Sequence, residues 1–219
     1  MRERNKTLVM RARKDVVERN RERLLELFHE SVPDRYLRFS IDDYLPENGS
    51  ESIIDEQAEV ALHSVVQEEP TFTIIRGQQG TGKTTLAVTL LDLWMKSFDL
   101  DIAPNGGVLN AKLFTFAKLL NELSFNREVM DELSNTYILA IDDIGAGSDT
   151  ISDHQLRYLT DLINDRWSRD LPTIFTTNMP ITSQRDSRGL SDLFASQSWD
   201  RITDSYVLVS LLGESHRGE

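Results

Sequence analysis

Gly77-Gln78-Gln79-Gly80-Thr81-Gly82-Lys83-Thr84 satisfies the pattern G-x-x-x-x-G-K-[ST]. This stretch follows an apolar, β-rich run at 71–76 and opens a helix-compatible segment at 83–97. Glycines allow backbone N–H groups to wrap a phosphate chain, the helix directs the positive end of its dipole there, and Lys83 adds a full charge. A glycine-rich turn that matches by chance is the alternative, and the flanking strand and helix argue against it. The predicted contacts to a bound nucleotide are Gly77, Gln79, Gly80, Thr81, Gly82, Lys83, Thr84 and Thr85.

Two neighbouring acids, Asp142 and Asp143, end the apolar run at 137–141. A phosphate loop needs a metal-side acid at the end of a neighbouring strand, so we expect Asp142 and the Thr84 hydroxyl to hold Mg²⁺. Asp143 stands where hydrolytic ATPases place the acid that orients or deprotonates the attacking water. The pair therefore predicts a Walker B strand. A capped transition from a buried strand to a loop is the alternative.

Asn178 follows the next β-rich run, at 172–177. Its amide is expected at the carboxyl edge of the sheet, beside the acids, where open α/β folds bind their ligands. There it could hydrogen-bond the γ-phosphate or the attacking water. Asn before Met179-Pro180 is also an ordinary turn former, and both interpretations stay open.

Outward from these motifs, short β-rich runs alternate with helix-compatible segments. Such alternation predicts βαβ units, and hence an α/β fold with a five-stranded parallel sheet covered by helices on both faces. The predicted strands are 71–76, 108–114, 136–142, 172–177 and 205–211, and the predicted helices are 54–67, 83–97, 116–123 and 152–169.

The N-terminal segment differs from the rest in charge. Residues 1–23 hold nine basic and four acidic residues, a local charge of +5. Since the whole chain has a net charge of −12, the remaining 196 residues carry −17. Residues 7–30 lack Gly and Pro and carry a thin apolar stripe, which predicts an amphipathic helix that buries little against its own domain. We expect 1–30 to be a basic docking arm, although a solvated helix face is the alternative. An acidic linker at 31–52 and a main domain at 53–219 complete the predicted organisation.

Composition excludes several classes of protein. The net charge of −12 argues against a protein that coats nucleic acid by itself, because such proteins need a broad cationic face. The absence of cysteine excludes disulfide scaffolds, Cys-ligated zinc and a thiol nucleophile. No run of about 18 apolar residues occurs, and the start is too charged for a signal peptide. We therefore expect a soluble, cytoplasmic protein that does not enter a membrane.

Taken together, these motifs resemble the AAA+ branch of phosphate-loop ATPases, with TIFTTN as a sensor 1 strand and Asp200-Arg201-Ile202 as an arginine-finger segment. Within AAA+, the sequence is similar to the DnaC/DnaI family of bacterial and phage replicative-helicase loaders over roughly residues 32–217. The motifs that carry this narrower resemblance are Val32-Pro33-Asp34-Arg35-Tyr36, Phe39-Ser40-Ile41-Asp42-Asp43-Tyr44, the IDDIGA form of Walker B, Asn164-Asp165-Arg166-Trp167 and Gly213-Glu214-Ser215-His216-Arg217.

The resemblance implies a five-stranded AAA+ domain that lacks the C-terminal helical lid and follows an N-terminal amphipathic helix. It implies that Arg201 reaches the ATP site of a neighbouring subunit in a spiral, so a lone subunit hydrolyses ATP weakly; an ion pair to Asp200 or Asp204 is the alternative. Arg217 maps to a sensor arginine, or else to a frayed chain end. Gln197 replaces a second arginine that some loaders carry.

The resemblance also implies partners. Residues 1–30 would bind a hexameric DnaB-type helicase, and single-stranded DNA would lie near Phe125, Lys112, Lys118 and the loop 148–154. Phe125 is the kind of aromatic that can stack a base, although core packing is the commoner role. The predicted function is ATP-dependent loading of the helicase onto single-stranded DNA in replication initiation. The alternatives are an IstB-like transposition helper that acts on duplex DNA, and a non-hydrolysing inhibitor or adaptor of a host loader or helicase.

Overall fold

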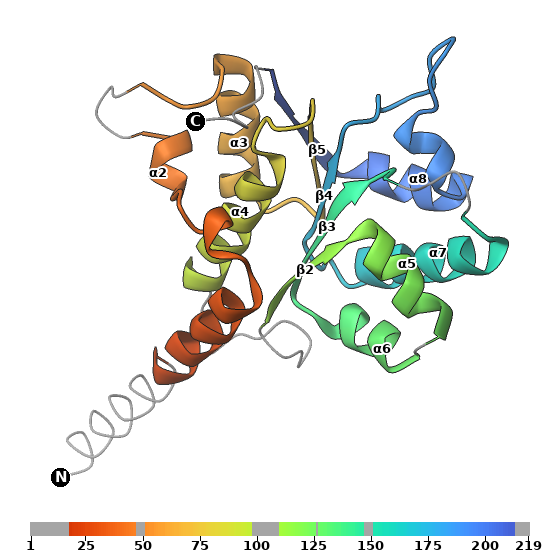
Figure 1. Cartoon of the computed structure of the whole chain (residues 1–219), viewed down its shortest axis with the longest axis horizontal. Coiled ribbons are helices and arrows are strands. Elements are labelled where there is room, and N and C mark those ends of the chain that lie inside the picture. The colour runs from red at the N-terminus through yellow and green to blue at the C-terminus, as the bar shows by residue number, and fades with distance from the viewer. Residues whose placement is uncertain (1–17, 47–50, 98–109, 126, 147–150, 213–219) are drawn as a thin grey trace, which may run out of the picture.

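The chain folds around one parallel β-sheet, flanked on both faces by helices (Figure 1). The computed structural model describes residues 18–46, 51–97, 110–125, 127–146 and 151–212. The five strands are all parallel, and each lies within three residues of its predicted position. The predicted α/β fold with a five-stranded parallel sheet is therefore confirmed. In spatial order the strands are β2 (Ala111–Thr115), β3 (Ile138–Ile144), β4 (Thr173–Thr177), β1 (Phe72–Gly77) and β5 (Tyr206–Leu211).

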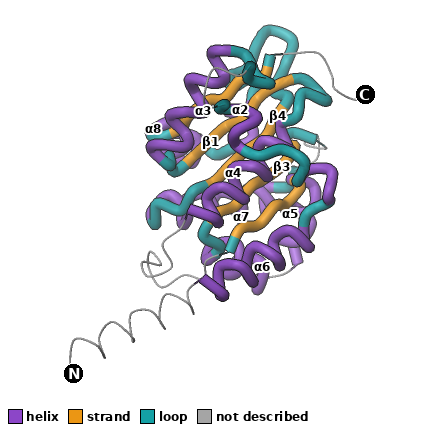
Figure 2. Tube along the Cα trace, turned by 90° about the vertical axis from the view of Figure 1, so that its left-hand side faces the viewer, coloured by secondary structure: helices purple, strands orange, loops and turns teal. Residues whose placement is uncertain are grey.

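Alternation along the strands builds two separate cores. On β3, Ile138 and Ala140 join the cluster that includes helices α3 (Glu56–Glu68) and α4 (Lys83–Ser97). Leu139 and Ile141 join the opposite cluster. Successive side chains of a strand point to opposite faces, so an uninterrupted apolar run can serve both layers. Figure 2 views the molecule from the α4 side. The second layer consists of α5 (Phe116–Phe125), α6 (Arg127–Asn135), α7 (Asp153–Ser168) and α8 (Ser196–Asp204).

Local capping explains where two of the predicted helices begin. Asp55 precedes α3 and its carboxylate accepts from the N–H groups of Gln57 and Ala58, both at 3.0 Å. Ser152 and Gln155 form a capping box at the start of α7. Sequence analysis missed α6, whose nine residues contain few apolar side chains. α6 is held through Leu133, which is fully buried in the core beside α7.

The described part of the N-terminal arm packs on the domain. Residues 18–31 are helical, and Phe28 and Val32 are buried in the same cluster as α3 and α4. His29 Nε2 lies 2.7 Å from Asp92 Oδ1 on α4. Of residues 18–31, Phe28 is buried and Leu24 and Leu25 pack partly against the same cluster, so the helix contacts its own domain through a thin apolar stripe. Residues 1–17 lie outside the described part.

The predicted linker also contains ordered structure. A 3-10 helix, η1 (Asp34–Tyr36), and a short helix, α2 (Ile41–Tyr44), lie within it. Tyr44 is buried in the core cluster of α3 and α4, and burial raises its pKa. The proposed division at residue 53 stays a prediction.

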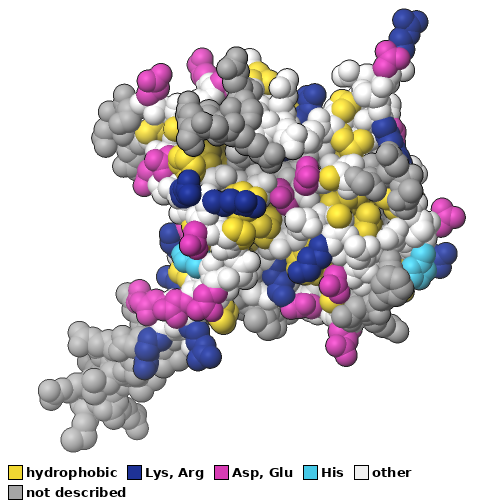
Figure 3. Space-filling model, in the orientation of Figure 1, with side chains coloured by type: hydrophobic (Ala, Val, Ile, Leu, Met, Phe, Trp, Pro, Cys, Tyr) yellow, Lys and Arg dark blue, Asp and Glu magenta, His cyan; other side chains and the backbone are white. Residues whose placement is uncertain are grey.

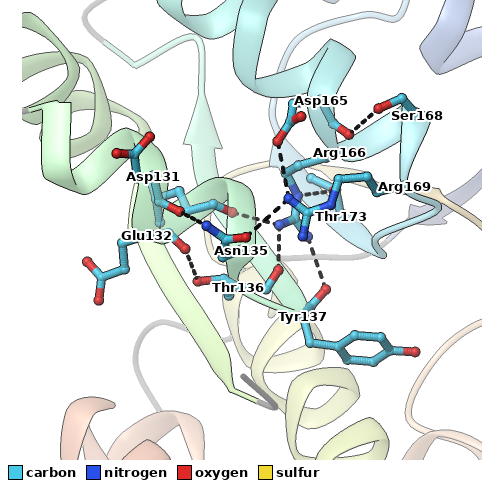
Figure 4. Close-up of polar contacts among 11 residues, drawn as sticks. Asp131, Glu132, Asn135, Thr136, Tyr137, Asp165, Arg166, Ser168, Arg169 and Thr173 are labelled. Atoms are coloured by element: carbon cyan, nitrogen blue, oxygen red, sulfur yellow. Dashed lines mark hydrogen bonds and ion pairs between the residues drawn. The ribbon is translucent and has the colours of Figure 1, made fainter. Parts of the chain in front are cut away.

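A buried cation joins the amino-terminal ends of β3 and β4 (Figure 4). Arg166 of α7 is completely buried and donates to the Thr173 hydroxyl at 2.8 Å. Burial lowers its pKa to about 9, so the guanidinium is still charged at neutral pH. Four backbone carbonyls complete its hydrogen bonding, those of Leu133, Thr136, Tyr137 and Pro172. Arg166 therefore ties α6, α7 and two central strands together.

Among the described residues, no helix combines the length and the apolar character needed to span a membrane. The last described element is β5. Residues 213–219, which include the predicted sensor arginine Arg217, lie outside the described part.

Candidate nucleotide-binding site

The predicted phosphate loop runs from the end of β1 to the start of α4. Gly80 and Gly82 have φ values of 89° and 85°, in the left-handed region that favours glycine. A Cβ on Gly77 would lie 2.6 Å from Thr81 Oγ1 and 2.7 Å from the Leu211 carbonyl oxygen. The loop therefore requires glycine for two different reasons, backbone conformation and close approach.

Lys83 is held at this loop. Its side chain is buried, and Nζ donates to the Gln78 carbonyl at 2.7 Å. The Thr81 hydroxyl donates to the same carbonyl at 3.0 Å. A cation and the first turn of α4 thus lie beside backbone N–H groups of the loop, an arrangement that suits a phosphate chain.

The predicted metal ligands lie side by side. Thr84 Oγ1 donates to the carboxylate of Asp142, at 2.9 Å from Oδ1 and 3.1 Å from Oδ2. Asp142 is buried at the end of β3. A hydroxyl and a carboxylate are hard oxygen ligands of the kind that bind Mg²⁺ together with phosphates and water. The residues present therefore fit the predicted metal.

Asp143 is exposed, whereas Asp142 beside it is buried. The pairing of β3 with β4 shifts register here, from Ile141↔Phe175 to Ile144↔Thr177. Asp143 has a φ of 60°, which is unusual for a residue other than glycine. The irregularity leaves one acid facing α4 and turns the next toward solvent, where a water molecule could reach it.

Asn178 directly follows β4 and is exposed. Arg76 of β1 pairs in register with Thr177, so Gly77 and Asn178 leave the sheet at the same edge. Arg76 Nε also donates to the Met179 carbonyl at 3.1 Å. The structure thus brings the phosphate loop, both acids and Asn178 to one edge of the sheet.

Arg201 lies in the last turn of α8 and is partly exposed. Its guanidinium lies over the ring of Trp167, which belongs to α7. Within the described ranges it forms no ion pair with Asp200 or Asp204, the alternative considered from the sequence. Its action in a neighbouring subunit stays a prediction, as does the role of Arg217.

Of the candidate DNA contacts, Lys112 and Lys118 lie on β2 and α5, whereas the phosphate loop follows β1. Lys112 is in β2, which β3 and β4 separate from β1, and it forms an ion pair with Glu132. Lys118 is exposed, and its ammonium lies 5.1 Å from the centre of the Phe114 ring. Phe125 ends α5, but its side chain is outside the described part, as are residues 147–150 of the second loop.

The surface charge agrees with the acidic composition. On the face drawn in Figure 3, basic and acidic side chains of the described residues are interspersed and form no single cationic surface. Single-stranded DNA binding therefore stays a prediction.

Sequence analysis missed the role of one residue in this site, Thr176. Its side chain is completely buried, and its hydroxyl lies within hydrogen-bonding distance of both the Asp142 carboxylate and the Asp143 N–H group. Its position at the carboxyl end of the predicted strand 172–177, the edge at which the acids were expected, was a usable signal.

Comparison with known proteins supports the fold. No protein-family model matches the sequence, and a search of curated proteins finds no match. The crystal structure of the DnaC helicase loader aligns with a TM-score of 0.59 and 22% identity, covering 82% of this chain and 100% of that chain. The crystal structure of DnaI aligns with a TM-score of 0.58 and 21% identity, covering 85% of this chain and 94% of that chain.

A more distant likeness is to the replication initiator DnaA bound to AMPPCP and single-stranded DNA. It has a TM-score of 0.55 and 15% identity, and the alignment covers 78% of this chain and 50% of that chain. At sequence identities of 15–22%, these comparisons show that the folds are similar. The chain therefore has the fold seen in the DnaC helicase loader and in DnaI, and its predicted resemblance to these proteins is confirmed at the level of the fold.

Proposed function

We propose that this chain is an ATPase that loads a replicative helicase onto single-stranded DNA. The observation that carries the proposal is the contact between Thr84 and Asp142, with exposed Asp143 next in the chain. This arrangement provides metal ligands beside a phosphate loop and an acid that water can reach. A non-hydrolysing inhibitor or adaptor, which acts only by binding its partner, would not need Asp143.

The residues divide the work of hydrolysis. The loop glycines and Lys83 bind the triphosphate, while Thr84 and Asp142 would hold Mg²⁺, which neutralises charge on the phosphates. Asp143 orients the attacking water and accepts its proton as the bond between the β- and γ-phosphates breaks, leaving ADP and inorganic phosphate. Asn178 hydrogen-bonds the γ-phosphate or the same water.

A single subunit is expected to turn over slowly. Arg201 is the predicted arginine finger, and in the isolated chain its guanidinium lies over the ring of Trp167. A guanidinium supplied by a neighbour can raise the rate by about 10³–10⁵-fold. Self-association into a spiral would therefore couple ATP binding to hydrolysis.

Partner recognition is assigned to residues 1–30. The basic composition of residues 1–23 suits an acidic surface of a DnaB-type hexamer, and Leu27, which is exposed, would add an apolar contact. ATP binding would assemble the spiral and its grip on single-stranded DNA, and hydrolysis would release it. The DnaC and DnaI likenesses and the ssDNA-bound DnaA support this reading. A protein of this function acts in the cytoplasm.

The decisive experiment is co-purification with a DnaB-type helicase, with and without ATP, followed by imaging of the complex. A chain lacking residues 1–17 is the informative variant, because it keeps Phe28 packed on the domain. We expect it to bind ATP normally and to lose the helicase. Retained helicase binding would refute the role of residues 1–17 in docking, and stimulation of turnover by duplex rather than single-stranded DNA would favour the transposition helper.

A further inference from the structure

We infer that Thr176 is a positioning residue that holds both acids of the site through one hydroxyl. This inference rests on the proposed ATPase function and adds a residue to its machinery. The two hydrogen bonds of the Thr176 hydroxyl go to Asp142 and Asp143, and the proposed mechanism gives Thr176 no contact with the nucleotide. It acts through Asp142 and Asp143.

The hydroxyl of Thr176 both donates and accepts a hydrogen bond. Oγ1 donates to Asp142 Oδ1 at 2.5 Å and accepts from the backbone N–H of Asp143 at 2.8 Å. A hydroxyl has a single proton to donate, so the donation to Asp142 leaves its lone pairs for the N–H of Asp143. The side chain is completely buried, so water cannot replace either bond.

The bond to Asp143 replaces a missing strand bond. β3 and β4 lose regular pairing between Ile141 and Ile144, which would leave the Asp143 N–H without an acceptor on β4. The Thr176 hydroxyl supplies that acceptor. It therefore stabilises the left-handed backbone at Asp143, the conformation that places the exposed carboxylate at the sheet edge.

The bond to Asp142 orients the metal-side carboxylate. Asp142 Oδ1 accepts from two hydroxyls, Thr84 on α4 and Thr176 on β4. Thr84 is itself a predicted metal ligand, so Thr176 is the partner that can stay with Asp142 when a metal binds. Residues that orient a metal ligand in this way commonly change metal affinity or activity by about 10–100-fold when they are removed.

The neighbouring residue offers a matched control. Thr177 is equally buried; its hydroxyl donates to the Ile144 carbonyl at 2.8 Å and accepts from the Met179 N–H at 3.0 Å. It therefore makes the same number and kind of bonds, but to neither acid. Thr→Val at either position removes a hydroxyl and keeps nearly the same volume.

The test compares Thr176→Val, Thr176→Ser and Thr177→Val in the full chain. We measure turnover at saturating ATP, affinity for a fluorescent ATP analogue with Mg²⁺ and with EDTA, and thermal stability. Thr176→Val is expected to lower turnover and the Mg²⁺-dependent gain in affinity by about tenfold or more, while affinity in EDTA changes less than about twofold. Thr176→Ser should restore most of both, and Thr177→Val should keep both despite a similar loss of stability.

Unchanged Mg²⁺-dependent affinity in Thr176→Val, or an equal loss in Thr177→Val, would overturn the inference. If the wild-type chain does not hydrolyse ATP, the proposed function fails by itself. The comparison of Mg²⁺-dependent affinity still decides whether Thr176 orients Asp142.

Discussion

The guanidinium carbon of Arg201 lies 4.9 Å from the centre of the Trp167 ring. The two residues occupy the last turns of neighbouring helices, α8 and α7, so the candidate arginine finger rests on an aromatic face of its own chain. A cation–π contact at a partly exposed site is worth only about 0.5–1 kcal/mol. That is weak enough for the arginine to leave when a neighbouring subunit offers the negative charge of a triphosphate.

Arg201→Ala and Asp143→Asn are each expected to stop most turnover while leaving ATP binding intact. Mixing the two variants should restore part of the activity, because some interfaces then combine an intact acid with an intact arginine. Phosphate release measured across a series of mixing ratios checks this. Arg169→Ala is the control, since Arg169 lies near the same end of α7 as Trp167 but bonds to Asn135 and Asp165 of its own chain. Failure of every mixture to recover would count against a shared site.

Lys83→Ala is expected to weaken ATP binding by at least about tenfold, because a charged donor is lost from the phosphate loop. Lys96→Ala is the matched control. Lys96 lies in the last turn of the same helix, α4, is exposed, and pairs with Asp92. Calorimetric titration with ATP distinguishes the two variants. Equal affinities would mean that the triphosphate does not bind at this loop.

Arg166→Met should reduce the free energy of unfolding by about 3 kcal/mol, because several buried oxygen atoms lose their donor at once. Arg166→Lys keeps the charge but not the planar fork, so its loss should be intermediate. Urea denaturation followed by circular dichroism gives both values. Arg169→Met should stay within about 1 kcal/mol of wild type, since its ion pair is partly solvated. A neutral Arg166→Met result would show that the carbonyls find other donors.

Phe28→Ala should reduce the free energy of unfolding by about 3–5 kcal/mol, because the ring is buried in the core cluster to which α3 and α4 contribute. Leu27→Ala, next in the chain but 53% exposed, should change it by less than about 0.5 kcal/mol. Thermal and urea unfolding of the two variants tests whether residues 18–31 belong to the domain. Similar small losses in both would mean that this helix is only loosely attached in solution.

Much of the candidate site could be predicted from sequence because its signals are local. The spacing of Gly77, Gly82 and Lys83 identifies the phosphate loop without reference to any other part of the chain. Asp142 and Asn178 each follow an apolar run, and parallel strands necessarily bring their carboxyl ends to one edge. Predicted strands within three residues of those observed were enough to place these groups together.

Other features could not be predicted, because each depends on residues distant in the chain. The burial of Phe28 requires α4, 55 or more residues later, to present a complementary surface. Arg166 finds its acceptors only when α6, α7 and the starts of β3 and β4 converge. Sequence spacing alone allowed an ion pair of Arg201 with Asp200 or Asp204, and it gave no indication of the contact with Trp167.

The sequence by itself determined the positions of the strands along the chain, the phosphate loop and the identity of the two acids, since these follow from periodicity and from the chemistry of adjacent residues. Tertiary structure alone decided the order of strands in the sheet and the register shift between β3 and β4. It also decided that a hydroxyl from β4 links Asp142 to Asp143. The physical reason is that a hydrogen bond acts over about 3 Å. Which atoms come that close is settled by the packing of whole elements and not by any one segment.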